Sequence, residues 1–267
     1  MNIEHAYILY HDKPKPVKYM TECKESCDKF NIPATSFKGF SVQEVTAQKI
    51  LDQWGLKVYP DLDKFIKENP EQGTTLYQET LCSAGHVAMW KEMIKNNHHA
   101  AAFFEHDVIV KRNFLDIDVE DDEIVYLGYR VAYEEDYECL PDTWVKYNIP
   151  MFGGTHAYAL NINTAKRLVN TLEQKPYLPT EKSIDWWLGH NFFNLTMKIV
   201  DPVPVVSVNC GRDSSIKHMF NNVANYNMPT SNGNFPPKFL EGIVHPERYY
   251  IDSARNWFMF EKGFSYD

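Results

Sequence analysis

The chain has 267 residues, of which 44% are hydrophobic and 24% charged, and its formal net charge is -9. This composition is too hydrophobic for a disordered protein, and the sequence has no run of the roughly 18–20 apolar residues that cross a membrane. An acidic chain with few basic clusters is also poorly suited to duplex nucleic acid, whose phosphates attract lysine and arginine. We therefore expect a soluble globular protein.

Strand and helix patterns alternate from the start of the chain. The apolar run from His5 to His11 predicts a buried strand, and Val17 to Phe30 predicts the helix after it, entered through Pro14 and Pro16. A strand that leads at once into a helix is typical of α/β proteins.

The next segment predicts two helices with a turn between them. Ser41 to Asn69 has a helical pattern that ends at a turn at residues 70–73. Thr75 and Gln78 have the spacing of a capping box, which predicts a second helix through Lys95. The apolar stripe of this helix consists of Ala84, Val87, Ala88, Trp90 and Ile94.

Further elements continue the alternation. His99 to Phe104 and Glu123 to Leu127 predict strands, and Thr155 to Leu160 predicts a strand followed by a helix capped at Asn163. Met197 to Val208 contains two prolines, which confine it to an edge or an irregular strand.

This alternation predicts an α/β fold with a mostly parallel sheet flanked by helices. We assign residues 1–211 to this domain, which would bind the substrates. Residues 212–267 are rich in Asn, Pro and aromatic side chains and have little periodicity. They are expected to form an irregular C-terminal segment packed on the main domain.

Three polar residues, Glu105, His106 and Asp107, follow the strand expected at residues 99–104. If the extended geometry continues, the two carboxylates at i and i+2 point to one side and His106 points to the other. Oxygen ligands on one face suit Mg²⁺ or Mn²⁺, which would bridge the oxygens of a bound diphosphate. Taken alone, the pattern also fits a solvated strand end.

Four segments resemble, in order, the motifs of glycosyltransferase family 25. This family includes lipopolysaccharide and lipooligosaccharide galactosyl- and glucosyltransferases and collagen galactosyltransferases. The segments are Leu81 to Trp90 (LCSAGHVAMW), the strand into Glu105-His106-Asp107, Gly153 to Leu160 (GGTHAYAL) and Ser183 to Leu188 (SIDWWL). The resemblance spans roughly Ala6 to Ile216, without residues 41–80.

The sequence departs from the family's motifs at three of these positions. Leu81 stands where the family usually has Gly, Gly85 where it has Ser, and His106 where it has the central Asp of an E-D-D motif. The outer carboxylates of that motif are kept, as are Cys82 and His86 of the helix motif.

The resemblance implies a GT-A fold with a Rossmann-type sheet and a divalent ion, Mn²⁺ or Mg²⁺, on Glu105 and Asp107. It also implies inverting transfer of a hexose, galactose or glucose, from a UDP-sugar to a hydroxyl of a glycan, glycolipid or glycoprotein. The ion would neutralise charge on the departing diphosphate. Inversion needs a base within hydrogen-bond reach of the acceptor oxygen, and Asp185, in the segment that matches the family's P-I-D-x-x-L, is the candidate.

The other predicted site residues surround the donor. Tyr10 and His11 end the first strand, at the ledge where ligands enter open α/β sheets, and are expected to contact the nucleotide. His86 and His156 are expected to line the donor site. His218 is the candidate third protein ligand of the metal.

Two other functions stay open. An inactive sugar-binding or scaffold protein of the same fold would fit His106 and the altered helix motif. A metal-dependent phosphohydrolase would fit Glu105 and Asp107 alone. Neither accounts for the order of the two later motifs.

Cysteine usage and the N-terminus bear on location. The five cysteines include no C-x-x-C pair, and Met1 to Tyr10 lacks the basic flank of a secretory signal. Free thiols in a bacterial or viral-host cytoplasm are therefore expected, in a pathway such as lipopolysaccharide biosynthesis.

Overall fold

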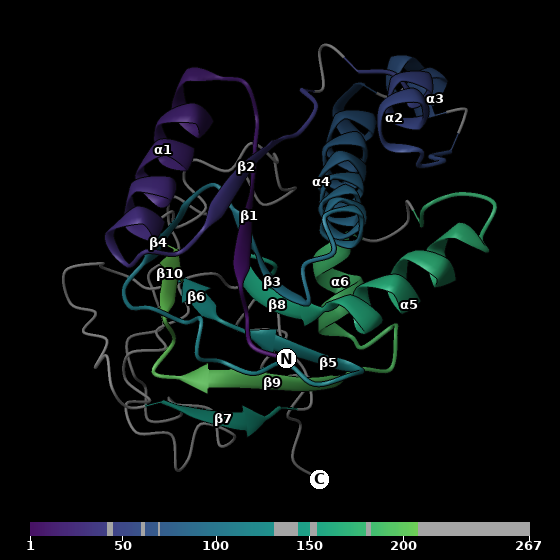
Figure 1. Cartoon of the computed structure of the whole chain (residues 1–267). Helices are drawn as coiled ribbons and strands as arrows, with labels where there is room; N and C mark the ends of the chain where they lie inside the picture. Colours follow the sequence, from purple (N-terminus) through teal and green to yellow (C-terminus); the bar gives the residue numbers. More distant parts are fainter. Residues whose placement is uncertain are drawn as a thin grey trace, which may run out of the picture.

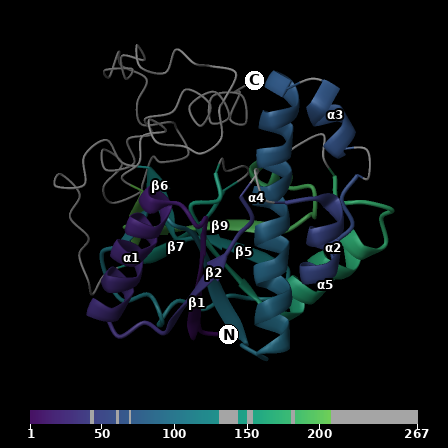
Figure 2. The same ribbon diagram turned by 90° about the horizontal axis from the view of Figure 1, so that it is seen from above.

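The computed structural model describes residues 1–41, 45–59, 62–68, 70–130, 144–149, 154–179 and 183–207. These residues form a large sheet with helices on both faces and a second, smaller sheet (Figure 1). Seen from above, α1 (Pro14–Lys29) lies on one side of the large sheet and α4 (Pro70–Lys95) on the other (Figure 2). The expected C-terminal segment at residues 212–267 lies outside the described residues, so the domain division stays a prediction.

The large sheet has the strand order β2-β1-β3-β8-β5-β9-β7. Its strands are β1 (His5–Tyr10), β2 (Ala34–Lys38), β3 (Ala100–Glu105), β5 (Glu123–Tyr126), β7 (Val145–Asn148), β8 (Ala157–Asn161) and β9 (Thr196–Asp201). β1 runs parallel to β2 and β3, and β5 runs parallel to β9, whereas β8 is antiparallel to β3 and β5, and β7 to β9. Because only β7 and β8 run against the other strands, the expected α/β fold with a mostly parallel sheet is confirmed.

The smaller sheet has the order β4-β10-β6 and contains β4 (Val108–Val110), β10 (Val205–Ser207) and β6 (Gly128–Arg130). The segment expected to be one strand at residues 197–208 is split between β9 and β10. β9 lies between β5 and β7 and not at an edge, so the segment agrees with the other expectation, an irregular strand, which is interrupted between β9 and β10. Pro202 and Pro204 fall in the link between the two strands, where no N–H is needed for a ladder.

Alternate residues of β1 and β3 enter two cores on opposite faces of the large sheet. Tyr7 and Phe103 belong to the core shared with α4, α5 (Ile162–Glu173) and α6 (Ile184–Gly189). Ile8 and Phe104 belong to the core shared with α1 and the smaller sheet. This period of two is that of strands buried on both faces. Ile8, Phe103 and Phe104 have no exposed surface, and burial of each contributes about 1.5–3 kcal/mol.

Two short helices replace the single helix expected at residues 41–69. α2 (Ala47–Trp54) begins after Thr46, whose side chain accepts a hydrogen bond from the Lys49 N–H at 3.2 Å. It ends at Gly55, which has a φ of 63°, a left-handed conformation that glycine adopts without strain. α3 (Leu62–Glu68) follows. The glycine therefore breaks the helical pattern.

Two helices begin earlier than expected. α4 begins at Pro70, before the predicted start at Thr75, so the turn predicted at residues 70–73 is wrong. Proline is compatible with the first turn of a helix, where its missing N–H is not needed. α5 begins after Asn161, whose side chain accepts a hydrogen bond from the Thr164 N–H at 2.9 Å. Asn161, rather than Asn163, is therefore the N-cap.

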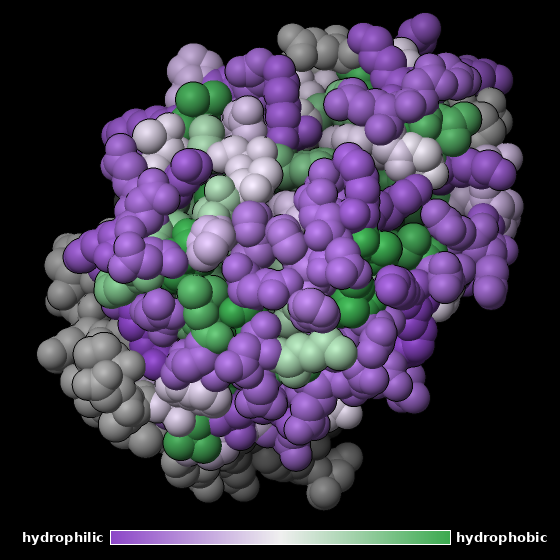
Figure 3. Space-filling view, in the orientation of Figure 1, coloured by the Kyte–Doolittle hydropathy of each residue, from purple (hydrophilic) through white to green (hydrophobic). Residues whose placement is uncertain are grey.

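The surface is largely polar on the side that faces the viewer in Figure 1. There, hydrophilic residues surround small, separate groups of hydrophobic ones (Figure 3). Among the described residues, none of the helices has both the length and the apolar character that crossing a membrane requires.

Candidate active site

The predicted site residues from three strands meet at one edge of the large sheet. β1 ends there at Tyr10 and β3 at Glu105, and β8 begins there because it is antiparallel to β3. The Glu105 N–H donates to the carbonyl oxygen of His156 at 3.0 Å. The sheet topology therefore brings His156 beside Glu105.

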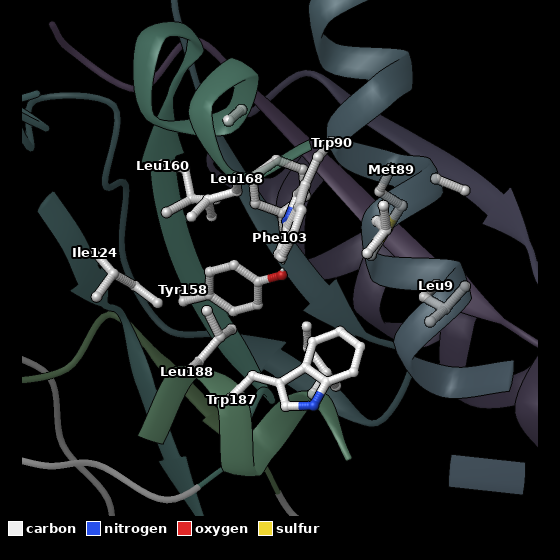
Figure 4. Close-up of a cluster of buried hydrophobic side chains, with 14 of the residues drawn as sticks. Leu9, Met89, Trp90, Phe103, Ile124, Tyr158, Leu160, Leu168, Trp187 and Leu188 are labelled. Atoms are coloured by element: carbon white, nitrogen blue, oxygen red, sulfur yellow. Dashed lines mark hydrogen bonds between the residues drawn. The ribbon is translucent and has the colours of Figure 1, made fainter. Parts of the chain in front are cut away.

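α6 brings Asp185 to the same edge. The Ile184 N–H donates to the Ser83 hydroxyl of α4 at 2.9 Å, which ties the first turn of α6 to α4. Ser183 occupies the N-cap position, although its side chain makes no capping hydrogen bond. Trp187 is only 1% exposed and packs in the core that β1 and β3 share with α4, α5 and α6 (Figure 4).

Thr155 links the two carboxylates of the site. Its Oγ1 lies 2.7 Å from Oε1 of Glu105 and 2.5 Å from Oδ1 of Asp185. A hydroxyl carries a single hydrogen, so Thr155 donates to one carboxylate at a time. It holds Glu105 and Asp185 on either side of one hydroxyl.

His156 supports the ionised form of Glu105. Its Nδ1 lies 3.7 Å from Oε2 of Glu105. Burial acts to raise the pKa of Glu105, but the neighbouring His156 ring, with a smaller contribution from the Thr155 hydroxyl, holds this pKa well below its ordinary value. Gly154 has a φ of 106°, and a Cβ there would lie 2.9 Å from Nε2 of His156. Only glycine therefore fits next to this imidazole.

His86 is held by a buried hydrogen-bonded group. Its Nδ1 lies 2.8 Å from the Tyr158 hydroxyl. The same hydroxyl accepts the indole N–H of Trp90 at 2.9 Å, and Figure 4 shows these two side chains together. His86 has no exposed surface, and burial lowers its pKa, so the ring is neutral at neutral pH. Among the described residues, its Nε2 has no hydrogen-bond partner.

Cys82 lies one helical turn before His86 on the same face of α4. Its Sγ, a ring nitrogen of His86 and a carboxylate oxygen of Glu105 lie within 4.8 Å of one another. Burial raises the pKa of the Cys82 thiol, and the charges of Glu105 and Asp185 raise it further. Activated nucleophiles have a lowered thiol pKa, so covalent catalysis by Cys82 is not favoured.

Tyr10 and His11 lie where β1 ends, at the same sheet edge as Glu105. The ring centroids of His11 and His106 are 6.3 Å apart. Burial, and to a lesser extent His106, lowers the pKa of His11 to about 4. Tyr10 and His11 thus lie at the end of the strands where ligands enter open α/β sheets, as expected. Their contact with a nucleotide stays a prediction.

The structure describes two of the three predicted metal ligands, Glu105 and Asp107. β3 ends at Glu105, and His106 and Asp107 form a turn before β4, so the extended geometry assumed for the pair does not continue. Asp107 is only 7% exposed, and its Oδ1 has no hydrogen-bond partner among the described residues. His218 lies outside the described residues. A metal on Glu105, Asp107 and His218 stays a prediction.

Thr155 and Tyr158 were not among the predicted site residues. Both belong to the GGTHAYAL segment, and they take part in the site because β8 begins at this edge and runs against β3. The pairing of β3 with β8 could not be foreseen from periodicity. The signal that could have found them is their place beside His156 in the GGTHAYAL segment, at the start of a strand.

Comparison with known proteins identifies a family. A sequence model of glycosyltransferase family 25 (LPS biosynthesis protein) matches residues 18–184, more than half of the chain. No curated protein sequence matches. Among solved structures, the chain is similar to a glycosyltransferase involved in the glycosylation of the major capsid of PBCV-1, with 11% identity and a TM-score of 0.32 over 76% of this chain and 92% of that one. This likeness is too slight to indicate a shared activity.

Proposed function

This protein belongs to glycosyltransferase family 25, and we propose that it moves a hexose, galactose or glucose, from a UDP-sugar to a hydroxyl of a glycan or glycoprotein acceptor, with Mn²⁺ or Mg²⁺. The observation that carries the proposal is the Glu105–Thr155–Asp185 link, which puts two carboxylates in one site at the edge of the sheet. Transfer from a nucleotide sugar calls for two such groups, one on the side of the diphosphate and one on the side of the acceptor.

Glu105 is the proposed carboxylate on the diphosphate side. Its lowered pKa keeps it ionised and therefore able to bind a cation. Asp107, with a buried oxygen that lacks a hydrogen-bond partner among the described residues, is the candidate second ligand. These donors fit a hard divalent ion. When bound, such an ion neutralises charge on the departing diphosphate.

Asp185 is the proposed base. It lies in the first turn of α6, and its Oδ1 is held 2.5 Å from the Thr155 hydroxyl. A base in an inverting displacement accepts the proton of the acceptor hydroxyl as that oxygen attacks the sugar. Thr155 would orient the carboxylate, and His86 and His156 would line the donor side. The uridine is proposed to lie over Tyr10 and His11, at the end of β1.

Replacement of Asp185 by Asn tests the base. Asp185→Asn should lower transfer by about 10²–10⁴-fold, because the amide cannot accept the proton, and donor binding should be retained. UDP release with a panel of glycan acceptors measures the first quantity. The thermal shift on adding a UDP-sugar with Mn²⁺ measures the second. Transfer at the unchanged rate would remove Asp185 from this role.

The same panel separates the alternative functions. A thermal shift with one UDP-sugar that disappears in chelator supports the transferase and identifies its donor. No shift with any UDP-sugar would favour an inactive scaffold. Metal-dependent hydrolysis of phosphate esters without sugar transfer would favour the phosphohydrolase.

A further inference from the structure

We propose that Cys82, His86 and Glu105 form a binding site for a zinc-class metal ion, which shares only Glu105 with the proposed hard-ion site on the carboxylates. The three side chains offer a thiol sulfur, an imidazole nitrogen and a carboxylate oxygen, and one donor atom from each lies within 4.8 Å of the other two. Thiolate and imidazole are the ligands that zinc prefers, whereas Mg²⁺ and Mn²⁺ prefer oxygen.

The helix presents two of the ligands together. Cys82 and His86 are four residues apart on α4, so their side chains lie on the same face one turn apart. β3 ends at Glu105 opposite that face and supplies the third. Ligands on a tetrahedral zinc ion stand about 3.4–3.7 Å apart, as follows from bond lengths of about 2.0–2.3 Å. The three ligand atoms are at most 4.8 Å apart, so small side-chain movements would bring them to the distances that zinc requires.

The free nitrogen of His86 is the second observation that points to a ligand. His86 has no exposed surface, and its Nε2 is buried without a hydrogen-bond partner among the described residues. A buried acceptor without a partner destabilises the fold unless something binds it. Its other nitrogen lies 2.8 Å from the Tyr158 hydroxyl. An outer hydrogen bond of this kind fixes the orientation of a metal-bound imidazole and leaves Nε2 for the ion.

The surrounding charges also favour a cation. Glu105, Asp185, Glu79 and Asp107 all act on Cys82 electrostatically. Binding displaces the thiol proton of Cys82 to solvent and forms the sulfur–metal bond. Three protein ligands leave a fourth position for water or another oxygen. Because Glu105 belongs to both sets of ligands, the zinc-class ion and a hard ion would compete for it.

The test uses Co²⁺ as a spectroscopic substitute for zinc on the reduced full-length chain, with no nucleotide or acceptor present. We expect one Co²⁺ per chain with a thiolate-to-cobalt charge-transfer band that Zn²⁺ removes by competition. Cys82→Ser should abolish the band, and His86→Gln should weaken Co²⁺ binding by about tenfold or more. Cys139→Ser and Cys210→Ser are matched controls and should retain it.

A band that survives Cys82→Ser, or is lost in either control, would overturn the proposal, as would the absence of any band in the parent chain. A second measurement needs no variant: Zn²⁺ should slow alkylation of Cys82, read by mass spectrometry, and an unchanged rate would also overturn the proposal. Both readouts use the metal alone, so their failure would leave the proposed sugar transfer untouched.

Discussion

Thr155 has a role in the site that valine, which has the same shape, cannot take. Thr155→Val removes the hydroxyl that stands 2.7 Å from Glu105 and 2.5 Å from Asp185, so the two carboxylates face each other without a shared donor. We expect a loss of about 10–100-fold in turnover, within the range of a positioned proton-transfer group. Sugar-donor turnover at saturating UDP-sugar measures it.

Thr155→Ser is the matched control, because it keeps the hydroxyl and should retain most of the turnover. If the valine and serine variants turned over equally, the hydroxyl would have no part in the reaction. Unfolding midpoints of both variants separate a lost function from a lost fold.

Tyr158 shows how a core residue and a site residue can be the same one. Its hydroxyl bonds both the Trp90 indole and His86, and all three side chains are buried. Tyr158→Phe keeps the ring but leaves two buried polar groups without this partner, which should lower the free energy of unfolding by about 1–3 kcal/mol. Urea denaturation measures this quantity. A variant as stable as the parent would mean that water or another group satisfies both partners.

The packing of α4 against β1 explains one departure from the family's helix motif. Gly85 stands where the family usually has serine, and a Cβ at this position would lie 2.8 Å and 2.9 Å from the two methyl groups of Leu9. Leu9 is only 5% exposed and has little room to move. The helix therefore approaches the strand closely, and a larger residue at position 85 would displace the end of the Leu9 side chain.

Gly85→Ala tests this contact. Alanine gains up to about 1 kcal/mol of helix propensity, but overpacking costs about 1–3 kcal/mol, so we expect net destabilisation. Leu9→Val in the same chain should recover part of the loss, because it shortens the side chain that the new Cβ meets. A double-mutant cycle measured by urea denaturation gives the coupling between the two sites. Additive effects would show that Gly85 is not limited by Leu9.

Elements with strong local signals were predicted well, and those fixed by distant contacts were not. β1, α1 and β3 carry long apolar runs or periodic stripes, so the strand–helix alternation was visible. The residues of β2 are exposed or half-buried, so β2 has no apolar run that would mark it as a strand. β4 and β6 have three residues each, which is too few to show a period of two. Glu105, Asp185, His86 and His156 could be chosen from motifs. Thr155 joins Glu105 to Asp185 because β3 pairs with β8 and because Ser83 binds Ile184. Each of these contacts links segments far apart in the sequence, so periodicity could not reveal it.

In the whole molecule, the sheet separates two cores, and two groups with lowered pKa values lie at the edge where β1 and β3 end. Glu105 and His11 lie at that edge, and both have pKa values lowered in the folded protein, for different reasons. For His11 the cause is burial of the ring, which disfavours the charged form. For Glu105 the favourable interaction with His156 outweighs burial. Both shifts make the fold less stable in acid, because the unfolded chain binds protons more readily than the folded one.

The pH dependence of stability follows from His11. Its pKa falls from 6.5 to about 4 on folding, so between these values the unfolded chain carries a proton that the folded chain does not. The free energy of unfolding should therefore be highest near neutral pH and fall as the pH drops from about 6.5 to 4, with a contribution from His11 of up to about 3 kcal/mol. Below its ordinary pKa of 4.5, Glu105 adds a loss of the same sign. Urea denaturation between pH 4 and 8 measures the profile. His11→Asn should make it less steep above pH 4.5, and the remaining slope comes from His5 and His86, whose pKa values are also lowered in the folded protein. A profile equally steep in this variant would show that other groups bind the protons.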